Sequence, residues 1–244
     1  MRLSKDILLA ALCCVAVPAA VQAQRPTHLV VAAYNDAAES KIAFAVLREA
    51  YRRLGITLEI QQFAGDVGND RINSGAVDGM LARSDGIEAR FPNVVQVGVP
   101  VVYVDVAVYS RDSTLRVRDW RDLSNVTVAT VRGMFYLERS VGDLHVRFVD
   151  TYGELYPLLL NRQVDAVVTS DLQMRMTLRP MPQGIVRNNI LASYMLYHYL
   201  HNKHAELVPE VERVLKDMLT DGTVARLREA TVADIASGRV ARLR

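Results

Sequence analysis

Hydrophobic positions along the chain predict two successive strand–helix–strand–helix–strand units. In the first unit, short apolar runs predict strands, and apolar positions at three- and four-residue spacing predict helices between them. These elements are expected, in chain order, over residues 28–33, 40–54 and 57–61, around residues 71–72, and from residue 77 onward. Alternating strands and helices are typical of a parallel sheet with helices on both faces.

The same order starts again after a charged, turn-rich stretch at residues 110–123, where we expect the chain to change lobe. Two further strands precede that stretch, over residues 94–97 and 101–109, and are divided by Gly98 and Pro100. The strands and helices of the second unit are expected, in chain order, over residues 126–131, 134–141, 145–149, 151–160, 164–169 and 171–178. Thr151 and Glu154 have the spacing of a capping box at the start of one helix.

The last part of the chain is expected to return to the first lobe. An apolar, aromatic strand over residues 190–200 leads into an amphipathic helix over residues 206–219 and a final helix after Gly222. The predicted lobes are therefore discontinuous: residues 24–109 and 189–244 form one, and residues 110–188 form the other.

One sequence stretch occurs twice, once in each predicted lobe. Val77-Asp78-Gly79-Met80-Leu81 is echoed by Val164-Asp165-Ala166-Val167-Val168. Each copy reads as a short buried strand that ends in a polar loop. The two aspartates begin these strands, and we expect them to satisfy backbone donors in the preceding turn. Two lobes with equivalent strand edges and a ligand between them would produce this echo.

The first 23 residues predict a cleaved secretory signal peptide. Basic residues near the start precede an apolar run at residues 7–17, and Val21-Gln22-Ala23 ends the segment with small residues. The apolar run is too short to span a bilayer. Cleavage before Gln24 would leave 221 of the 244 residues. We therefore expect the mature chain to lie in the periplasm.

Composition excludes several classes of function. Cys13 and Cys14 both lie in the signal peptide, so the mature chain has no disulfide. Removing the signal lowers the formal net charge from +2 to +1, which argues against a nucleic-acid partner. No phosphate loop or nucleophile elbow is present in the sequence, and no cofactor is expected. His198, His201 and His204 recur at three-residue spacing, but at a strand end, where such spacing does not converge on a metal.

Candidate ligand-binding residues lie where the predicted parallel strands end, because ligands of open parallel sheets sit beyond those ends. An arginine there can bind a carboxylate through two hydrogen bonds. Two alternatives stay open: Arg83 could pair with Asp85, and Asp36 could cap the helix that follows. The strand-exit candidates are Tyr34, Asp36, Arg83, Asp85, Arg132, Tyr136, Ser170 and Asp171.

The chain resembles the bacterial periplasmic solute-binding proteins of the family 3 type, the amino-acid-binding group of ABC importers. The resemblance rests on the order and spacing of several stretches across nearly the whole mature chain. They are Asn73-Ser74-Gly75-Ala76-Val77-Asp78-Gly79, Glu88-Ala89-Arg90-Phe91-Pro92-Asn93, Asp119-Trp120-Arg121-Asp122-Leu123 with the strand to Arg132-Gly133, Asn161-Arg162-Gln163-Val164-Asp165-Ala166-Val167-Val168, and Asp221-Gly222-Thr223. It implies a type II two-lobe α/β fold, with a mainly parallel, helix-flanked sheet in each lobe and two crossing hinge strands.

The resemblance also implies positions for the ligand. An arginine twelve residues after the first strand aspartate would hold a carboxylate, and here that residue is Arg90. Arg83 and Asp85 stand where the family carries hydroxyl side chains, Ser170 stands at the ammonium-binding aspartate position, and small hydroxyl residues are replaced by Met134 and Phe135. These departures leave the fold prediction unchanged and weaken the case for a standard amino acid as the ligand.

We therefore predict a monomeric, non-enzymatic binding protein that delivers a small anionic or zwitterionic solute to an ABC importer. Arg90 or Arg83 would bind its carboxylate, Asp171 an ammonium group, and the walls would be Tyr34, Phe135 and Tyr136. Two alternatives stay open. One is a ligand-sensing input protein for a membrane receptor. The other is a dehydratase-like periplasmic enzyme that uses an acid or base among Asp36, Asp85 and Asp171.

Overall fold

The computed structural model describes residues 25–33, 37–63 and 67–239. The strands are β1 (His28–Ala33), β2 (Thr57–Gln62), β3 (Gly79–Ser84), β4 (Val94–Ser110), β5 (Val128–Val131), β6 (Val146–Val149), β7 (Ala166–Ser170) and β8 (Val186–His201). The α-helices are α1 (Ala38–Arg53), α2 (Val67–Asn73), α3 (Phe135–Ser140), α4 (Tyr152–Leu160), α5 (Asp171–Thr177), α6 (Val208–Thr220) and α7 (Thr223–Ala236). The predicted signal peptide lies outside the described residues.

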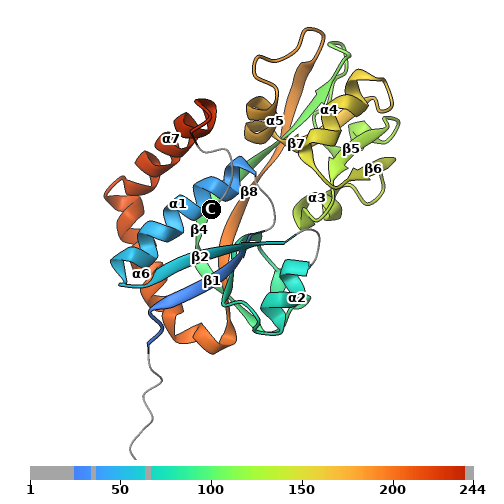
Figure 1. Ribbon diagram of the computed structural model, residues 1–244. Helices are drawn as coiled ribbons and strands as arrows, with labels where there is room; N and C mark the ends of the chain where they lie inside the picture. Colours follow the sequence, from blue (N-terminus) through green and yellow to red (C-terminus); the bar gives the residue numbers. More distant parts are fainter. Residues whose placement is uncertain (1–24, 34–36, 64–66, 240–244) are drawn as a thin grey trace, which may run out of the picture.

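The strands form one sheet in the order β2-β1-β3-β8-β4-β7-β5-β6 (Figure 1). At one end β1 runs parallel to β2 and β3, and at the other β5 runs parallel to β6 and β7. Helices flank both ends, so each end is one of the predicted parallel units. The long strands β4 and β8 run antiparallel between them. The predicted two-lobe α/β fold with two crossing strands is confirmed.

The hydrogen-bonded sheet is continuous from one lobe to the other, whereas the sequence suggested separate sheets. Continuity arises because β4 and β8 pair along almost their full length, from Val94 opposite His201 to Ser110 opposite Val186. The predicted lobe limits, between residues 109 and 110 and between residues 188 and 189, fall inside these strands. They stay a prediction.

Strand β4 was expected as two strands, because Gly98 and Pro100 interrupt its apolar run. The structure contains a single strand, whose pairing with β8 shifts register between Gln96 and Pro100 and again before Val102. Irregular pairing of this kind accommodates proline and glycine within a sheet, since the proline need not donate to a regular ladder.

The repeated stretch forms the same backbone arrangement in both lobes. In the first, the N–H of Val30 donates to Oδ2 of Asp78 at 2.8 Å, and the N–H of Asp78 donates to the Val30 carbonyl at 2.7 Å. In the second, Thr127 and Asp165 form the same reciprocal pair, with both bonds at 2.8 Å. The structural role predicted for the two aspartates is confirmed, but their backbone partner belongs to the neighbouring strand segment and not to the preceding turn.

Amphipathic helices cover the sheet as their spacing predicted. Helix α1 buries apolar residues that include Ile42, Val46 and Leu47, and α7 lies beside it (Figure 1). Helix α6 buries Val211, Val214, Leu215 and Met218, and a fifth apolar residue of this helix follows them. The fifth, Leu219, is 50% exposed. Among the described residues, no helix combines the length and the hydrophobicity needed to cross a bilayer.

Candidate functional site

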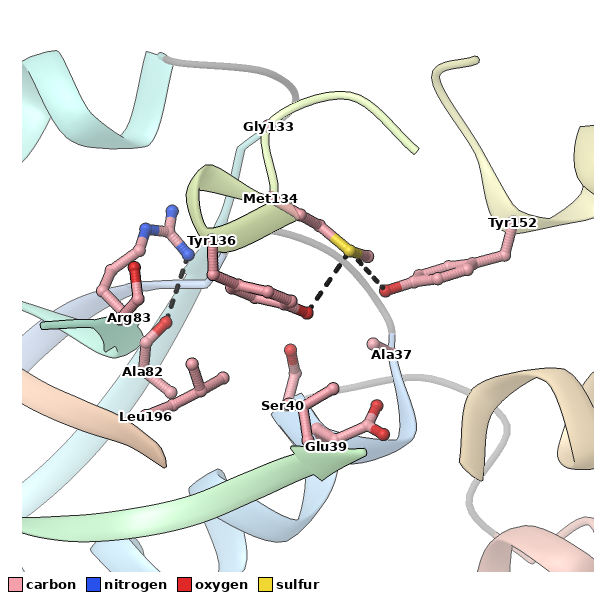
Figure 2. A pocket seen from close by; sticks show the side chains of 12 residues that line it. Ala37, Glu39, Ser40, Ala82, Arg83, Gly133, Met134, Tyr136, Tyr152 and Leu196 are labelled. Atoms are coloured by element: carbon pink, nitrogen blue, oxygen red, sulfur yellow. Dashed lines mark hydrogen bonds between the residues drawn. The ribbon is translucent and has the colours of Figure 1, made fainter. Parts of the chain in front are cut away.

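A cavity of about 60 Å³ lies between the two ends of the sheet, where both lobes contribute side chains (Figure 2). The first lobe contributes the start of α1 and the end of β3, the crossing strands contribute one residue each, and the second lobe contributes the loop before α3 and the starts of α3 and α4. The lining residues are Ala37, Glu39, Ser40, Ala82, Arg83, Ser84, Val104, Gly133, Met134, Tyr136, Tyr152 and Leu196. Parallel strands such as β3 end here, as expected for an open α/β sheet.

Glu39 is a buried acid in this cavity that the sequence did not single out. Its side chain lies in the first turn of α1, and the residue is 5% exposed. Burial raises the pKa of its carboxyl group, and the hydrogen bond from Ser170 partly opposes that rise. The helix was expected to begin at Ser40 and begins two residues earlier. That difference brings Glu39 into the first turn, where an acidic residue is an ordinary helix-start signal.

Arg83 brings a positive charge to the cavity from the end of β3. Its Nη1 donates to the carbonyl of Ala82 at 3.2 Å, and Figure 2 shows its guanidinium group beside Tyr136. Of the arginines proposed from the sequence, Arg83 is the one that lines the cavity. A guanidinium at this position can bind a carboxylate.

Aromatic and thioether groups from the second lobe form the opposite wall. The hydroxyl groups of Tyr136 and Tyr152 point to the sulfur of Met134, at 3.4 and 3.8 Å (Figure 2). The ring of Tyr136 also packs against Tyr194, with 4.7 Å between centroids. Burial raises the pKa of the Tyr136 hydroxyl, which therefore stays protonated. This wall offers apolar surface and neutral hydrogen-bonding groups.

Hydrogen bonds connect the lobes beside the cavity, and two of them involve the start of α1. The N–H of Ala38, at the start of α1, donates to Oε1 of Gln173 in α5 at 2.7 Å. The hydroxyl of Ser170 donates to Oε1 of Glu39. Ser170 also accepts the N–H of Gln173 at 3.0 Å, so it caps α5 while binding the other lobe. Both contacts join residues more than 130 positions apart in the chain.

Three predicted ligand-binding residues lie away from the cavity lining. Arg90 is exposed and stacks on the ring of Phe91, with 5.3 Å to its centroid. Asp85 is exposed and accepts a hydrogen bond from Gln96. Arg132 pairs with an aspartate of the second lobe at 3.5 Å. The twelve-residue spacing to Arg90 therefore does not bring that guanidinium to the cavity.

Asp171, predicted as an ammonium partner, is buried in a different network. Its carboxylate accepts a hydrogen bond from the Tyr109 hydroxyl at 2.7 Å, and it forms ion pairs with Arg175 and Arg187 at 3.0 and 3.1 Å. These partners tie α5 to both crossing strands. Asp171 is not among the residues that line the cavity.

Tyr34 and Asp36 lie outside the described residues, and so does the side chain of Phe135. The proposed capping of α1 by Asp36 falls in the same category. Among the described residues, two candidates from the sequence, Arg83 and Tyr136, line the cavity. Ser170 does not line it, but its hydroxyl donates a hydrogen bond to Glu39, which does.

The three histidines have separate partners. His198 is fully buried, and its Nε2 lies 2.8 Å from the Tyr51 hydroxyl. His204 lies 2.8 Å from Asp78, and His201 bonds to the backbone of its own loop. Within the described part of the chain, no group of three or more histidine, cysteine or acidic residues is placed to hold a metal ion. The expectation that the three histidines do not converge on a metal therefore agrees with their separate partners, and the absence of metal binding stays a prediction.

Solved structures of similar proteins identify the fold of this chain. No protein-family model matches the chain. An uncharacterised protein of Shewanella oneidensis is 22% identical over 222 residues, which cover 86% of this chain and 83% of that protein.

Among solved structures, a mutant of ArgBP from T. maritima superimposes with a TM-score of 0.70 at 19% identity, over 85% of this chain and 96% of that one. A histidine kinase sensor domain with similarity to periplasmic binding proteins gives 0.72 at 19% identity, over 84% and 96%. The VFT2 domain of Bordetella pertussis BvgS gives 0.67 at 21% identity, over 84% and 93%. These similarities show that the chain has the fold of family 3 solute-binding proteins. The similar structures include an arginine-binding protein and a histidine kinase sensor domain.

Proposed function

We propose that this chain is an exported binding protein that encloses a small, carboxylate-bearing solute between its two lobes. The observation that carries the proposal is the position of Arg83, whose guanidinium lines a cavity to which both lobes contribute. Tyr136, Tyr152 and Met134 would cover the apolar part of the ligand. Solved proteins with this fold include arginine-bound and glutamine-bound examples, which supports ligand binding as its use here.

The proposed lobes are residues 24–109 with 189–244, and residues 110–188. Their relative movement would open and close the cavity by hinge motion of the crossing strands. The predicted signal peptide supports a location in the periplasm, and so does the similarity to a sensor domain that itself resembles periplasmic binding proteins. The chain would act as a monomer that presents its ligand to a membrane protein, and it would not chemically change that ligand.

Delivery of the ligand to an ABC importer is the first candidate for that membrane step. A second candidate is a sensory role, and it is favoured by the similarity to a histidine kinase sensor domain and to the BvgS domain. Deleting the gene and following the identified ligand would separate them. A transport role predicts loss of uptake, whereas a sensory role predicts normal uptake and a lost transcriptional response. Conversion of the ligand by the pure protein would instead support the enzymatic alternative.

The binding proposal is tested by a thermal-shift screen of small carboxylates against the exported chain, followed by calorimetry of the best ligand. A ligand stabilises the protein in proportion to the logarithm of its concentration over its dissociation constant. Loss of a charge-assisted pair in Arg83→Ala should weaken binding by about 2–4 kcal/mol, roughly 30- to 1000-fold.

Arg90→Ala is the matched comparison, because it removes an exposed guanidinium from the same lobe. We expect its affinity to stay within about threefold of the wild type. An intact affinity in Arg83→Ala together with a large loss in Arg90→Ala would refute the proposed anchor and restore the twelve-residue spacing.

A further inference from the structure

A second hollow, which we call the outer groove, lies on the opposite face of the crossing strands from the cavity. Tyr103 and Met195 stand opposite each other in the pairing of β4 with β8, and both line this groove. Val104 and Leu196, the next residue on each strand, line the cavity instead. Successive side chains of a strand point to opposite faces, so the groove and the cavity lie back to back across the same two strands.

Helices that flank the first lobe form the other wall of the outer groove. Helices α1, α6 and α7 pack against one another, α1 and α6 also pack against β4, and all three contribute to the lining (Figure 1). The groove has a volume of about 390 Å³. Binding sites for small organic molecules are concave and mostly apolar, with volumes of roughly 300–1,000 Å³. The outer groove therefore has the size and shape of such a site.

The outer groove leaves apolar side chains in contact with water. Tyr103, Met195 and Leu219 line it and are 47%, 59% and 50% exposed. Six large hydrophobic residues are exposed in the described part of the chain, and half of them are thus gathered in this one hollow. Single exposed apolar residues are ordinary on a protein surface, whereas a cluster of them marks a binding surface. An apolar ligand in the groove would remove this surface from water.

An acidic group lies at the end of the outer groove that is nearer the second lobe. Asp105 and Ser193 are paired across the two strands, and the Ser193 hydroxyl donates to Oδ1 of the half-buried Asp105 at 2.6 Å. Two residues of a strand span about 7 Å, which sets the distance between the Tyr103 and Asp105 side chains along the groove.

The base at this end of the outer groove already has a partner. The guanidinium group of Arg228 lies over the ring of Tyr103, at 4.0 Å from its centroid. The charges of Arg228 and Asp105 also act, in opposite directions, on the buried carboxyl group of Glu39. Two acidic groups therefore meet one basic group here, and a cation in the groove would complement them better than an anion would.

We propose that the outer groove is a second binding site, which takes a small organic cation with an apolar body and an ammonium group about 7 Å from it. The body packs on Tyr103, Met195 and Leu219, and the ammonium group donates to Asp105 beside the Ser193 hydroxyl. Burial of the apolar surface supplies affinity, and the charge-assisted hydrogen bond fixes the orientation. This site is separate from the cavity between the lobes and does not depend on the function proposed for that cavity.

An NMR titration with methyl-labelled methionine tests the proposal, because Met195 lines the outer groove and Met134 lines the cavity. The probes are phenylalkylamines with one to four methylene groups and the phenylalkanols of the same lengths. The best amine should shift the methyl signal of Met195 and leave that of Met134 in place. It should also bind at least tenfold more tightly than the alcohol of equal length. We expect the longer amines to bind best, because they span the distance from Tyr103 to Asp105.

Calorimetry of four variants separates the two parts of the outer groove. Asp105→Asn keeps an acceptor for Ser193 and should reduce the preference for amine over alcohol at least fivefold. Met195→Gln makes the wall polar at nearly the same length, and should weaken both series at least threefold without changing the preference. Glu59→Gln and Val67→Gln remove an exposed carboxylate and an exposed apolar side chain elsewhere, and should bind both series as the wild type does.

Several results would overturn the assignment of the outer groove. They are a shift of Met134 without Met195, equal affinity of the wild type for amine and alcohol, and failure of every probe to bind. A concentration-dependent dimer that Met195→Gln disperses would assign the groove to a second copy of the chain, and would equally overturn the proposal. None of these results bears on the cavity, which is tested with carboxylates and Arg83→Ala. Thermal unfolding of each variant confirms that it is folded.

Discussion

At the scale of the residue, the chemistry of the cavity is set by the guanidinium group of Arg83, the hydroxyl group of Tyr136 and the buried carboxyl group of Glu39. Arg83 and Tyr136 were expected at strand exits and do line the cavity, because β3 and the segment before α3 end where the hydrophobic pattern placed them. Glu39 was missed, since an acid in a first helical turn carries no sign of its burial against another lobe. Arg90 lies over the ring of the neighbouring Phe91, a contact that residue spacing cannot reveal.

The burial of His198 makes the stability of the protein depend on pH. Burial lowers the pKa of His198 to about 4, and the neutral ring bonds to the Tyr51 hydroxyl and to the Met80 carbonyl. An unfolded histidine titrates near pH 6.5, so the unfolded chain binds more protons between pH 6.5 and 4. The contribution of His198 to stability is therefore present above that window and is lost as the pH falls through it.

His198→Gln should remove this dependence. Between pH 7 and pH 4.5 the wild type should lose roughly 2–3 kcal/mol more unfolding free energy than the variant, measured by urea unfolding. His28→Gln, on the edge of the same lobe, is the matched control and should keep the wild-type slope. A variant with an unchanged slope would show that His198 is protonated without cost in the folded protein.

At the scale of the element, strand and helix types followed from the hydrophobic period, whereas continuity of the long strands did not. The capping box before α4 was visible as Thr151 and Glu154, and the backbone N–H of the former does donate to the carboxylate of the latter at 3.0 Å. From the sequence, β4 was interpreted as two strands, because glycine and proline such as Gly98 and Pro100 usually interrupt a strand. Pairing with β8, a contact between segments about 100 residues apart, overrides that local signal.

Gly79, the small residue in the first copy of the repeat, should not tolerate a methyl group. A Cβ at this position would lie 2.6 Å from the carbonyl oxygen of Tyr199, so β3 and β8 would have to separate. Gly79→Ala should lower the unfolding free energy by more than about 2 kcal/mol. Gly142→Ala, where nothing lies within 4 Å of the added carbon, should change it by less than about 0.5 kcal/mol. Equal stabilities in chemical unfolding would contradict the close approach of these strands.

At the scale of the whole molecule, the two-lobe arrangement was predictable from the restart of the strand–helix order, but the contacts between lobes were not. Two of those contacts join Ala38 to Gln173 and Glu39 to Ser170, across more than 130 residues, without any periodic pattern. They come from the ends of α1 and α5, and the sequence places such helix ends only to within a few residues. An interface made by helix ends is therefore visible only in the folded chain.

Removing one of these contacts should shift the empty protein toward open conformations. Gln173→Ala deletes the acceptor for the Ala38 N–H and leaves the Ser170 cap of α5 intact. A single hydrogen bond of about 1 kcal/mol changes the ratio of closed to open molecules roughly fivefold. Small-angle scattering should report a larger radius of gyration. Gln163→Ala, which removes a contact within the second lobe, should leave the radius at its wild-type value.

The pairing of β4 with β8 gives the molecule a particular kind of mechanics. Any rotation of one lobe against the other must twist a two-stranded ribbon, because the strands stay bonded through the region that joins the lobes. Such a ribbon behaves as a torsional spring, and its softest points are the irregular pairings near Pro100 and between Val106 and Tyr109. Substitutions there would alter the stiffness of the spring. They would thereby change the rate at which a bound ligand is released, without changing any residue that contacts it.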